Sequence, residues 1–413
     1  MNKNARTKSF TLKRLSGQSI LTLIISLTAV SVVNADWRFE PVLRVGGEKD
    51  DNPTLSVRTD DVLDDTGYLI DASVRFDYRS ELTQFYITPR ILSRNYSDHP
   101  DELDSDDLFL DVSFSHDTES STFGFGLGYD SQTVRTAERA DADLDVDDPG
   151  EIPDDDTGFV GFQDEREKWR FAPGWSYRFS DANSLGVEFN YTDVTYAEAF
   201  QVFLNDYTDA QLRVSFDRKF SERTTWVVSA TGRNFETADG SNETTSYGFM
   251  AGFERSLSET TYVRALIGVE DIDSTISEAD PTLIADISLW RRLETINLLA
   301  QYRRSVNSGG SGKLSSRDAI NINLSRRLNE KVTAGLGARI SKTDSLDDSV
   351  SINERDYIQL RAQFIWHLSS RFATELDYRY TFQQRSALPD SSNSNQVILW
   401  FVYQPNSIDR RFR

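Results

Sequence analysis

The chain has 413 residues, and its 66 acidic residues outnumber its 45 basic ones, so that the formal net charge is −21 at pH 7. This acid excess argues against nucleic-acid binding, because it would repel phosphates. There is no cysteine, which fits an exported protein that folds without disulfides. The mean hydropathy is negative, but this does not distinguish a soluble protein from a membrane barrel, since only every second residue of a barrel strand faces lipid.

The N-terminal segment predicts export from the cytoplasm. Its basic residues are Lys3, Arg6, Lys8, Lys13 and Arg14. The apolar run over 20–33 is short for a transmembrane helix, and Val33-Asn34-Ala35 places small residues at the expected cleavage positions. We therefore expect residues 1–35 to form a cleaved signal peptide, with an uncleaved anchor as the alternative. No later apolar run is long enough for a transmembrane helix, so a membrane position would require a closed barrel.

The stretch over 67–96 reads as two strands joined by a short turn. In its first arm Tyr68, Val74 and Phe76 share one face, while Asp71 and Arg75 belong to the other. The second arm, after Ser80-Glu81-Leu82, alternates in the same way. This alternation predicts a hairpin with one apolar and one charged face.

Similar short polar turns recur about every forty residues along the chain. They begin at Arg79, Thr118, Phe179, Phe220, Leu257, Arg292, Leu328 and Leu368. Longer connections lie between them, and 98–107 and 138–156 are the richest in acid. With a first strand over 37–46 and a last over 396–403, the pattern predicts an all-β fold: a transmembrane antiparallel β-barrel of about 18 strands over 36–405 with a tail over 406–413. The short turns would be periplasmic and the longer acidic loops extracellular.

Alternation within the strands supports a barrel. The segment 169–179 places Trp169, Phe171, Trp175, Tyr177 and Phe179 on one face, which suits lipid or a large core. A soluble sandwich is the alternative, but no helical segment is predicted to cover such a sheet. Aromatic residues near strand ends are candidates for interfacial girdles: Tyr78, Trp226, Tyr262, Tyr302 and Trp366.

The charged faces of the strands predict a lumen that leans basic. The candidate lining residues are Arg75, Arg90, Arg170, Arg178, Arg213, Arg264, Arg292, Arg361 and Arg379. Fewer acids share these faces, so the negative charge of the chain is concentrated in the loops. The alternative is that these arginines only pair with acids across strands and keep the interior wet.

Catalysis finds little support in the sequence. The three histidines, His99, His116 and His367, are not spaced like metal ligands or members of a catalytic triad. The acidic runs offer carboxylates to a glycosidase or a divalent cation, but solvated loops are the commoner case, and 141–156 lacks the spacing of an EF-hand. We therefore expect no enzymatic activity, no cofactor and no metal.

The sequence also resembles a known family. Gly46-Gly47-Glu48-Lys49-Asp50-Asp51-Asn52-Pro53 and the following turn at Arg79-Ser80-Glu81 are similar to the opening of the β-barrel porin 2 proteins. That family includes outer-membrane barrels associated with exopolysaccharide and exosortase gene clusters. The resemblance implies an 18-stranded porin in the outer membrane of a Gram-negative cell, which exports capsular or biofilm exopolysaccharide. It also implies two partners, a periplasmic polysaccharide export protein and an inner-membrane co-polymerase.

Three functions follow as hypotheses. The first is a conduit for an anionic or neutral polysaccharide, with a wide basic and aromatic lumen. The second is a structural or binding barrel with a plugged lumen, whose acidic loops display a surface or anchor a partner. The third is a general diffusion porin, for which 138–163 is the one candidate for an inward-folding constriction loop.

Overall fold

The computed structural model describes residues 37–139, 165–197, 204–275, 280–346 and 354–405, apart from 387 and 389. The strands are β1 (Trp37–Asp50), β2 (Asp65–Arg79), β3 (Thr83–Tyr96), β4 (Ser105–Asp117), β5 (Ser121–Thr133), β6 (Glu165–Ser180), β7 (Asn183–Tyr196), β8 (Tyr207–Ser221), β9 (Thr224–Thr237), β10 (Glu243–Ser258), β11 (Thr261–Ser274), β12 (Thr282–Arg292), β13 (Ile296–Asn307), β14 (Ser315–Asn329), β15 (Val332–Ser345), β16 (Arg355–His367), β17 (Phe372–Arg385) and β18 (Ser391–Tyr403). Three short helices are η1 (Thr59–Asp61), α2 (Pro100–Leu103) and α3 (Val134–Glu138). The predicted signal peptide and the predicted tail lie outside the described residues.

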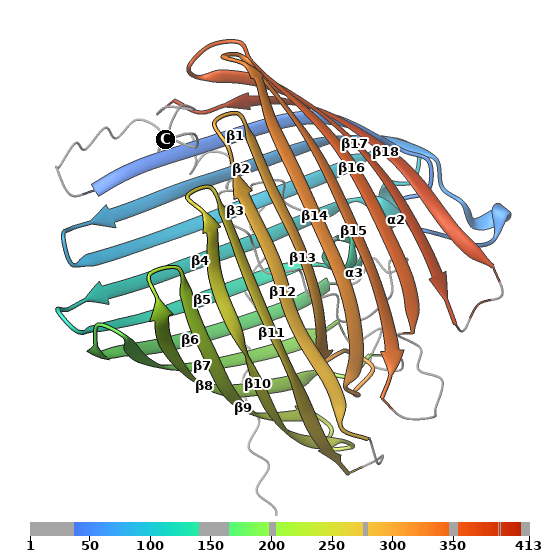
Figure 1. Cartoon of the computed structure of the whole chain (residues 1–413). Coiled ribbons are helices and arrows are strands. Elements are labelled where there is room, and N and C mark those ends of the chain that lie inside the picture. The colour runs from blue at the N-terminus through green and yellow to red at the C-terminus, as the bar shows by residue number, and fades with distance from the viewer. Residues whose placement is uncertain are drawn as a thin grey trace, which may run out of the picture.

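The described strands form one closed antiparallel barrel (Figure 1). Each strand pairs with its neighbours in sequence, and β18 pairs with β1 over Leu43↔Tyr403 to Asp50↔Gln396, which closes the sheet. The prediction of an all-β antiparallel barrel of about 18 strands is confirmed by the 18-stranded sheet. Among the described residues, no helix is both long enough and apolar enough to cross a membrane.

The short turns lie together at one end of the barrel, at the upper left in Figure 1. Each predicted turn connects two consecutive strands. Hydroxyl side chains hold several of them: the amide of Thr83 donates to the Ser80 hydroxyl (3.0 Å), and the amide of Ser121 donates to the Thr118 hydroxyl (2.9 Å). In barrels of the outer membrane this end faces the periplasm. At the opposite end of the barrel, two strands extend further than the sequence predicted. Strand β1 ends at Asp50, and β18 begins at Ser391.

Apolar side chains form the outward face of the barrel. Phe249, Val269 and Leu283 are adjacent in the register of β10, β11 and β12 and are all exposed. The predicted aromatic face of β6 is outward too, and Trp169 is 46% exposed. Because a closed barrel satisfies its own backbone groups, a continuous apolar band of this kind faces lipid. The chain is therefore a transmembrane barrel.

Two sequence predictions need correction. Tyr262 was a candidate for the outer girdle, but it pairs with Trp290 in the inward register, and their ring centroids are 5.2 Å apart. The acidic segment 98–107 is not all a solvated loop, because it contains α2 and the first residues of β4. Asp107, in β4, is fully buried. In both cases the residue faces the interior, which local hydrophilicity does not reveal.

The two faces of β8 should differ in their tolerance of charge. Val214 is outward and exposed, whereas Ser215 is inward, opposite Gly186 and Ser229. We expect Val214→Arg to lower the free energy of unfolding by about 2–4 kcal/mol, because the charge enters the hydrocarbon layer. The matched variant Ser215→Arg should cost clearly less. Urea titration of the barrel in lipid vesicles would measure both, and equal costs would mean that the outward face of β8 does not lie in lipid.

Candidate functional site

The inward faces of the strands define the candidate site, which is the lumen of the barrel. The walls formed by β6–β9 and by β14–β17 are predominantly basic. Their inward cations are Arg166, Lys168, Arg170, Arg178, Arg213, Lys219 and Arg233 on the first wall and Arg317, Arg327, Arg339, Arg355, Arg361, Arg379 and Arg385 on the second. The wall formed by β1–β5 carries more carboxylates: Glu40, Glu48, Asp50, Asp71, Asp77, Asp107, Asp111 and Asp130. These thirteen strands thus present two basic walls and one mixed wall.

Four of the predicted lining arginines are partly exposed in the lumen. The exposed fractions of their side chains are 38% for Arg90, 48% for Arg170, 40% for Arg213 and 34% for Arg264. Each lies near a carboxylate: Asp71 at 2.9 Å, Asp130 at 3.3 Å, Glu188 at 3.9 Å and Glu254 at 3.7 Å, respectively. The three longer contacts are weak, so Arg170, Arg213 and Arg264 keep donors that a solute can use. Arg90 is held more firmly, because its Nε and Nη2 atoms donate to the two carboxylate oxygens of Asp71 at 2.9 and 3.1 Å.

Arginines on the mixed wall also lie over aromatic rings. Arg75 lies 4.0 Å from the centroid of Tyr86, and Arg90 lies 5.2 Å from that of Phe109. Close by, Arg44 lies 4.7 Å from the ring of Trp400. Stacking of this kind holds a guanidinium plane in place while leaving its edge available to hydrogen-bond acceptors.

The other predicted lining residues have different surroundings. Arg361 and Arg379 are buried and share one carboxylate, Asp377, to which their Nε and Nη2 atoms donate at 2.8 and 3.1 Å. Arg178 and Arg292 lie at the short-turn end of the barrel, where both are exposed. The nine arginines therefore do not form one cluster but are distributed around and along the lumen.

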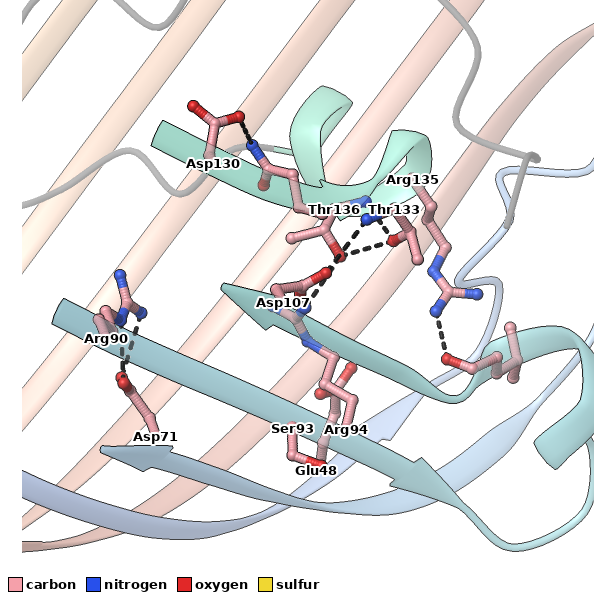
Figure 2. A network of polar contacts seen from close by, with 12 residues as sticks. Glu48, Asp71, Arg90, Ser93, Arg94, Asp107, Asp130, Thr133, Arg135 and Thr136 are labelled. Atoms are coloured by element: carbon pink, nitrogen blue, oxygen red, sulfur yellow. Dashed lines mark hydrogen bonds and ion pairs between the residues drawn. The ribbon is translucent and has the colours of Figure 1, made fainter. Parts of the chain in front are cut away.

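A short segment after β5 folds into the barrel (Figure 1). It contains α3, which begins where the Thr133 hydroxyl accepts a hydrogen bond from the Thr136 amide (3.2 Å). Figure 2 shows how Arg94 and Asp107 reach this helix from β3 and β4: Arg94 donates to Asp107 (2.7 Å) and to the Thr136 hydroxyl (2.9 Å). Asp107 also accepts from the Thr133 amide (3.1 Å). These contacts fix the first turn of α3 against the wall.

The end of α3 is attached to a different part of the wall. Arg355 of β16 donates to Glu138 (2.8 Å), and both side chains are buried. The next residue, Arg139, donates to Asp50 of β1 (2.6 Å) and to Ser394 of β18 (2.8 Å). Burial alone would lower the pKa of Arg139, but the Asp50 carboxylate outweighs this and raises that pKa. The α3 segment is therefore tied to five strands: β1, β3, β4, β16 and β18.

A second segment crosses the long-loop end of the lumen. It is the connection 308–314 between β13 and β14, where the Asn205 amide donates to Gly310 O and the Asn242 side chain donates to Gly312 O, each at 2.7 Å. Gly310 lies so close to Tyr196 that an added Cβ would be 2.6 Å from the hydroxyl oxygen. Leu314 of this connection and Val134 of α3 belong to one buried apolar cluster. The other members of the cluster are Val194, Tyr196, Leu204, Tyr207, Phe235, Ile272, Ile284 and Val306. Two inward-folded segments thus meet in an apolar core at this end of the lumen.

Sequence reasoning missed this inner layer. Glu138 was assigned to a hydrated acidic connection, but it is fully buried. The hypothesis of an inward-folding loop over 138–163 touches the described residues only at Glu138 and Arg139, which do lie inside the barrel. The rest of that segment, including 141–156, lies outside the described residues. The one local signal was the pair Thr133 and Thr136, which provides the N-terminal cap of α3.

The histidines are distributed over both ends of the barrel. His99 lies 3.1 Å from Asp65 at the long-loop end, whereas His116 lies 2.9 Å from the Thr83 hydroxyl at the short-turn end. Within the described part of the chain, no group of three or more histidine, aspartate or glutamate side chains is placed to hold a metal ion.

Comparison with known proteins assigns no family to the chain. No family model matches it, and no curated protein matches it. Among solved structures it is similar to the outer-membrane channel DcaP of Acinetobacter baumannii, with 11% identity, a TM-score of 0.44 and coverage of 91% of this chain and 98% of that one. It is also similar to OccAB4 of Acinetobacter baumannii (9% identity, TM-score 0.45, coverage 90% and 100%) and to the siderophore receptor PirA of Pseudomonas aeruginosa (10% identity, TM-score 0.42, coverage 89% and 80%). Similarity at this level identifies no substrate, and the resemblance to the β-barrel porin 2 proteins stays a prediction.

Proposed function

We propose that this barrel is an outer-membrane channel that exports an anionic exopolysaccharide. The observation that carries the proposal is the placement of Arg90, Arg170, Arg213 and Arg264 on inward faces with partly exposed side chains. They come from four different strands, so a chain passing along the lumen would meet separate weak contacts in place of one tight site. Weak contacts at several positions permit passage, because a solute that binds must also leave. Guanidinium donors suit uronate carboxylates and sugar hydroxyls.

The inner layer makes this channel a gated one in our proposal. The α3 segment and the 308–314 connection occupy part of the lumen at the long-loop end. A polymer would pass only after at least one of them moved. The proposed periplasmic export protein and inner-membrane co-polymerase would deliver the chain at the opposite, short-turn end; these two partners rest on the resemblance alone.

A strain that lacks the gene, complemented with altered barrels, tests the proposal. The variant R90E/R170E/R213E/R264E should fold, because lumen positions tolerate charge and the buried acids Asp71 and Asp130 keep Arg44 and Arg166 as partners. We expect it to reduce extracellular polymer several-fold by repelling uronates. The matched variant R90K/R170K/R213K/R264K keeps the charge and should export nearly normally. Barrel abundance in the outer membrane is measured in parallel. A normal amount of extracellular polymer from the glutamate variant would show that the charged lining is not needed for export. A normal amount from the deletion strain would show that this barrel is not the exporter.

A general diffusion porin is the second candidate, and the inward fold of α3 favours it. Such a segment narrows a lumen and sets a size limit for small solutes. Liposome swelling separates the two functions: a porin would admit small anionic saccharides without any partner, whereas a gated exporter would admit them slowly until α3 is released. A barrel that stays closed to ions even after that release would instead be a plugged structural barrel.

A further inference from the structure

Four arginines face outward near the short-turn end of the barrel. They are Arg218 of β8, Arg255 of β10, Arg291 of β12 and Arg326 of β14, and all four are exposed. Each has an apolar residue two positions before it and another two positions after it: Phe216 and Phe220, Phe253 and Leu257, Leu289 and Leu293, and Leu324 and Leu328. Since side chains alternate along a strand, each arginine interrupts the outward apolar band at the same level.

These guanidiniums have no acidic neighbour in the sheet. The residues directly opposite are Trp226 and Asn183 for Arg218, Thr224 and Val263 for Arg255, Thr261 and Leu298 for Arg291, and Ile296 and Ala334 for Arg326. Each following turn carries a glutamate, but within the described residues no ion pair joins it to its arginine. Unpaired cations at four corresponding positions are therefore available to a ligand outside the barrel.

The arginines occupy only one half of the circumference. At the same level on β2, β6 and β16 the outward residues are Tyr78, Tyr177 and Trp366. Aromatic residues of this kind lie at the boundary between hydrocarbon and lipid headgroups. The arginines of β8 to β14 thus also lie at headgroup level, on the periplasmic side. Alternate strands are roughly 10 Å apart, so each arginine can contact a separate headgroup.

A groove beside Arg326 supplies the second part of the site. Its volume is about 460 Å³, and it lies on the outer surface of β14–β17. Leu324, Leu336, Phe364 and Leu376 line it, and the small side chains of Ala334 and Ala362 leave the space between them. Arg326 lines the same groove. An apolar groove that has a cation at headgroup level matches a phospholipid, with its acyl chain in the groove and its phosphate on the guanidinium.

We propose that the arc of Arg218, Arg255, Arg291 and Arg326 binds anionic phospholipids of the periplasmic leaflet, and that one lipid places an acyl chain in the groove beside Arg326. A net negative headgroup is favoured because four unpaired cations face the same leaflet. The aromatic residues on the other half of the circumference would anchor the barrel at headgroup level without any preference for the charge of the lipid.

Native mass spectrometry of the purified barrel with equal amounts of phosphatidylglycerol and phosphatidylcholine of matched acyl chains tests this site. The unaltered barrel should retain phosphatidylglycerol preferentially. Each arginine removed should reduce that preference by about fivefold, so R218Q/R255Q/R291Q/R326Q should abolish it. Heat-modifiable migration on a gel confirms that each variant is folded.

The inward cations that directly follow Arg218 and Arg326 in the chain provide the matched control. R218Q/R326Q removes two outward charges, whereas K219Q/R327Q removes two inward charges at the same level. The outward pair should lose most of the preference and the inward pair should keep it. The reverse result would place the lipid at the inner rim, and equal retention of phosphatidylglycerol by the unaltered barrel and the fourfold variant would overturn the site.

Discussion

Glu138→Gln should increase the ion conductance of the barrel in planar lipid bilayers. Glu138 and Arg355 form a buried ion pair with an N–O distance of 2.8 Å, and their side chains are 0% and 2% exposed. Removing one partner of such a pair leaves the other charge uncompensated, which costs about 3–5 kcal/mol. The pair joins α3 to β16 and not one strand to another. Its loss therefore destabilises the closed state, in which α3 lies inside the lumen, and not the barrel wall. We expect the ratio of open to closed barrels to rise by roughly a hundredfold or more.

The second anchor of α3 makes the effect separable. Arg139 binds Asp50 of β1 and Ser394 of β18, the two strands that meet where the barrel closes. Arg139→Gln should therefore also open the lumen, and the double variant should conduct more than either single one. Asp344→Asn is the control, since it removes an exposed pair with Lys342 that contributes at most about 1 kcal/mol. Unchanged conductance in the double variant would show that α3 does not limit passage.

The strands of this barrel could be predicted from the sequence because their signals are local. Outward and inward residues alternate along each strand, and several short turns carry their own polar cap, as at Ser80 and Thr118. The closure of the sheet followed from the requirement that a barrel in a membrane satisfies its own backbone groups. Strand ends at the long-loop side were less predictable, because there polar residues continue both the strand and the loop. Asp50 and Ser391 are examples.

The inner layer was beyond the reach of the sequence for a physical reason. Its contacts join residues that are far apart in the chain, such as Glu138 and Arg355, or Asn242 and Gly312. A helix of five residues has no amphipathic period to detect. An acidic residue that pairs with a distant arginine looks the same in sequence as one that is solvated. The inward position of the arginines followed from alternation, but which of them are buried depends on partners across the wall.

Asp377→Asn should cause the largest loss of stability among single substitutions on the basic wall. Asp377 is 1% exposed and accepts hydrogen bonds from Arg361 Nε (2.8 Å) and from Arg379 Nη2 (3.1 Å). The asparagine has nearly the same shape but no charge, so the two buried guanidiniums lose the carboxylate that they share. Loss of one partner from a buried pair costs about 3–5 kcal/mol, and here the lost partner serves two cations. We therefore expect the free energy of unfolding to fall by at least about 3 kcal/mol.

Urea titration in lipid vesicles, followed by tryptophan fluorescence, would measure this loss. Glu188→Gln is the matched control, because Glu188 is also an inward acid opposite an arginine, but its side chain is 58% exposed and lies 3.9 Å from Arg213. We expect that control to change the free energy of unfolding by less than about 1 kcal/mol. A small effect of Asp377→Asn would mean that water or other carboxylates compensate Arg361 and Arg379. In that case both guanidiniums could contact a passing solute, and the exposed arginines Arg90, Arg170, Arg213 and Arg264 would not be the whole charged lining.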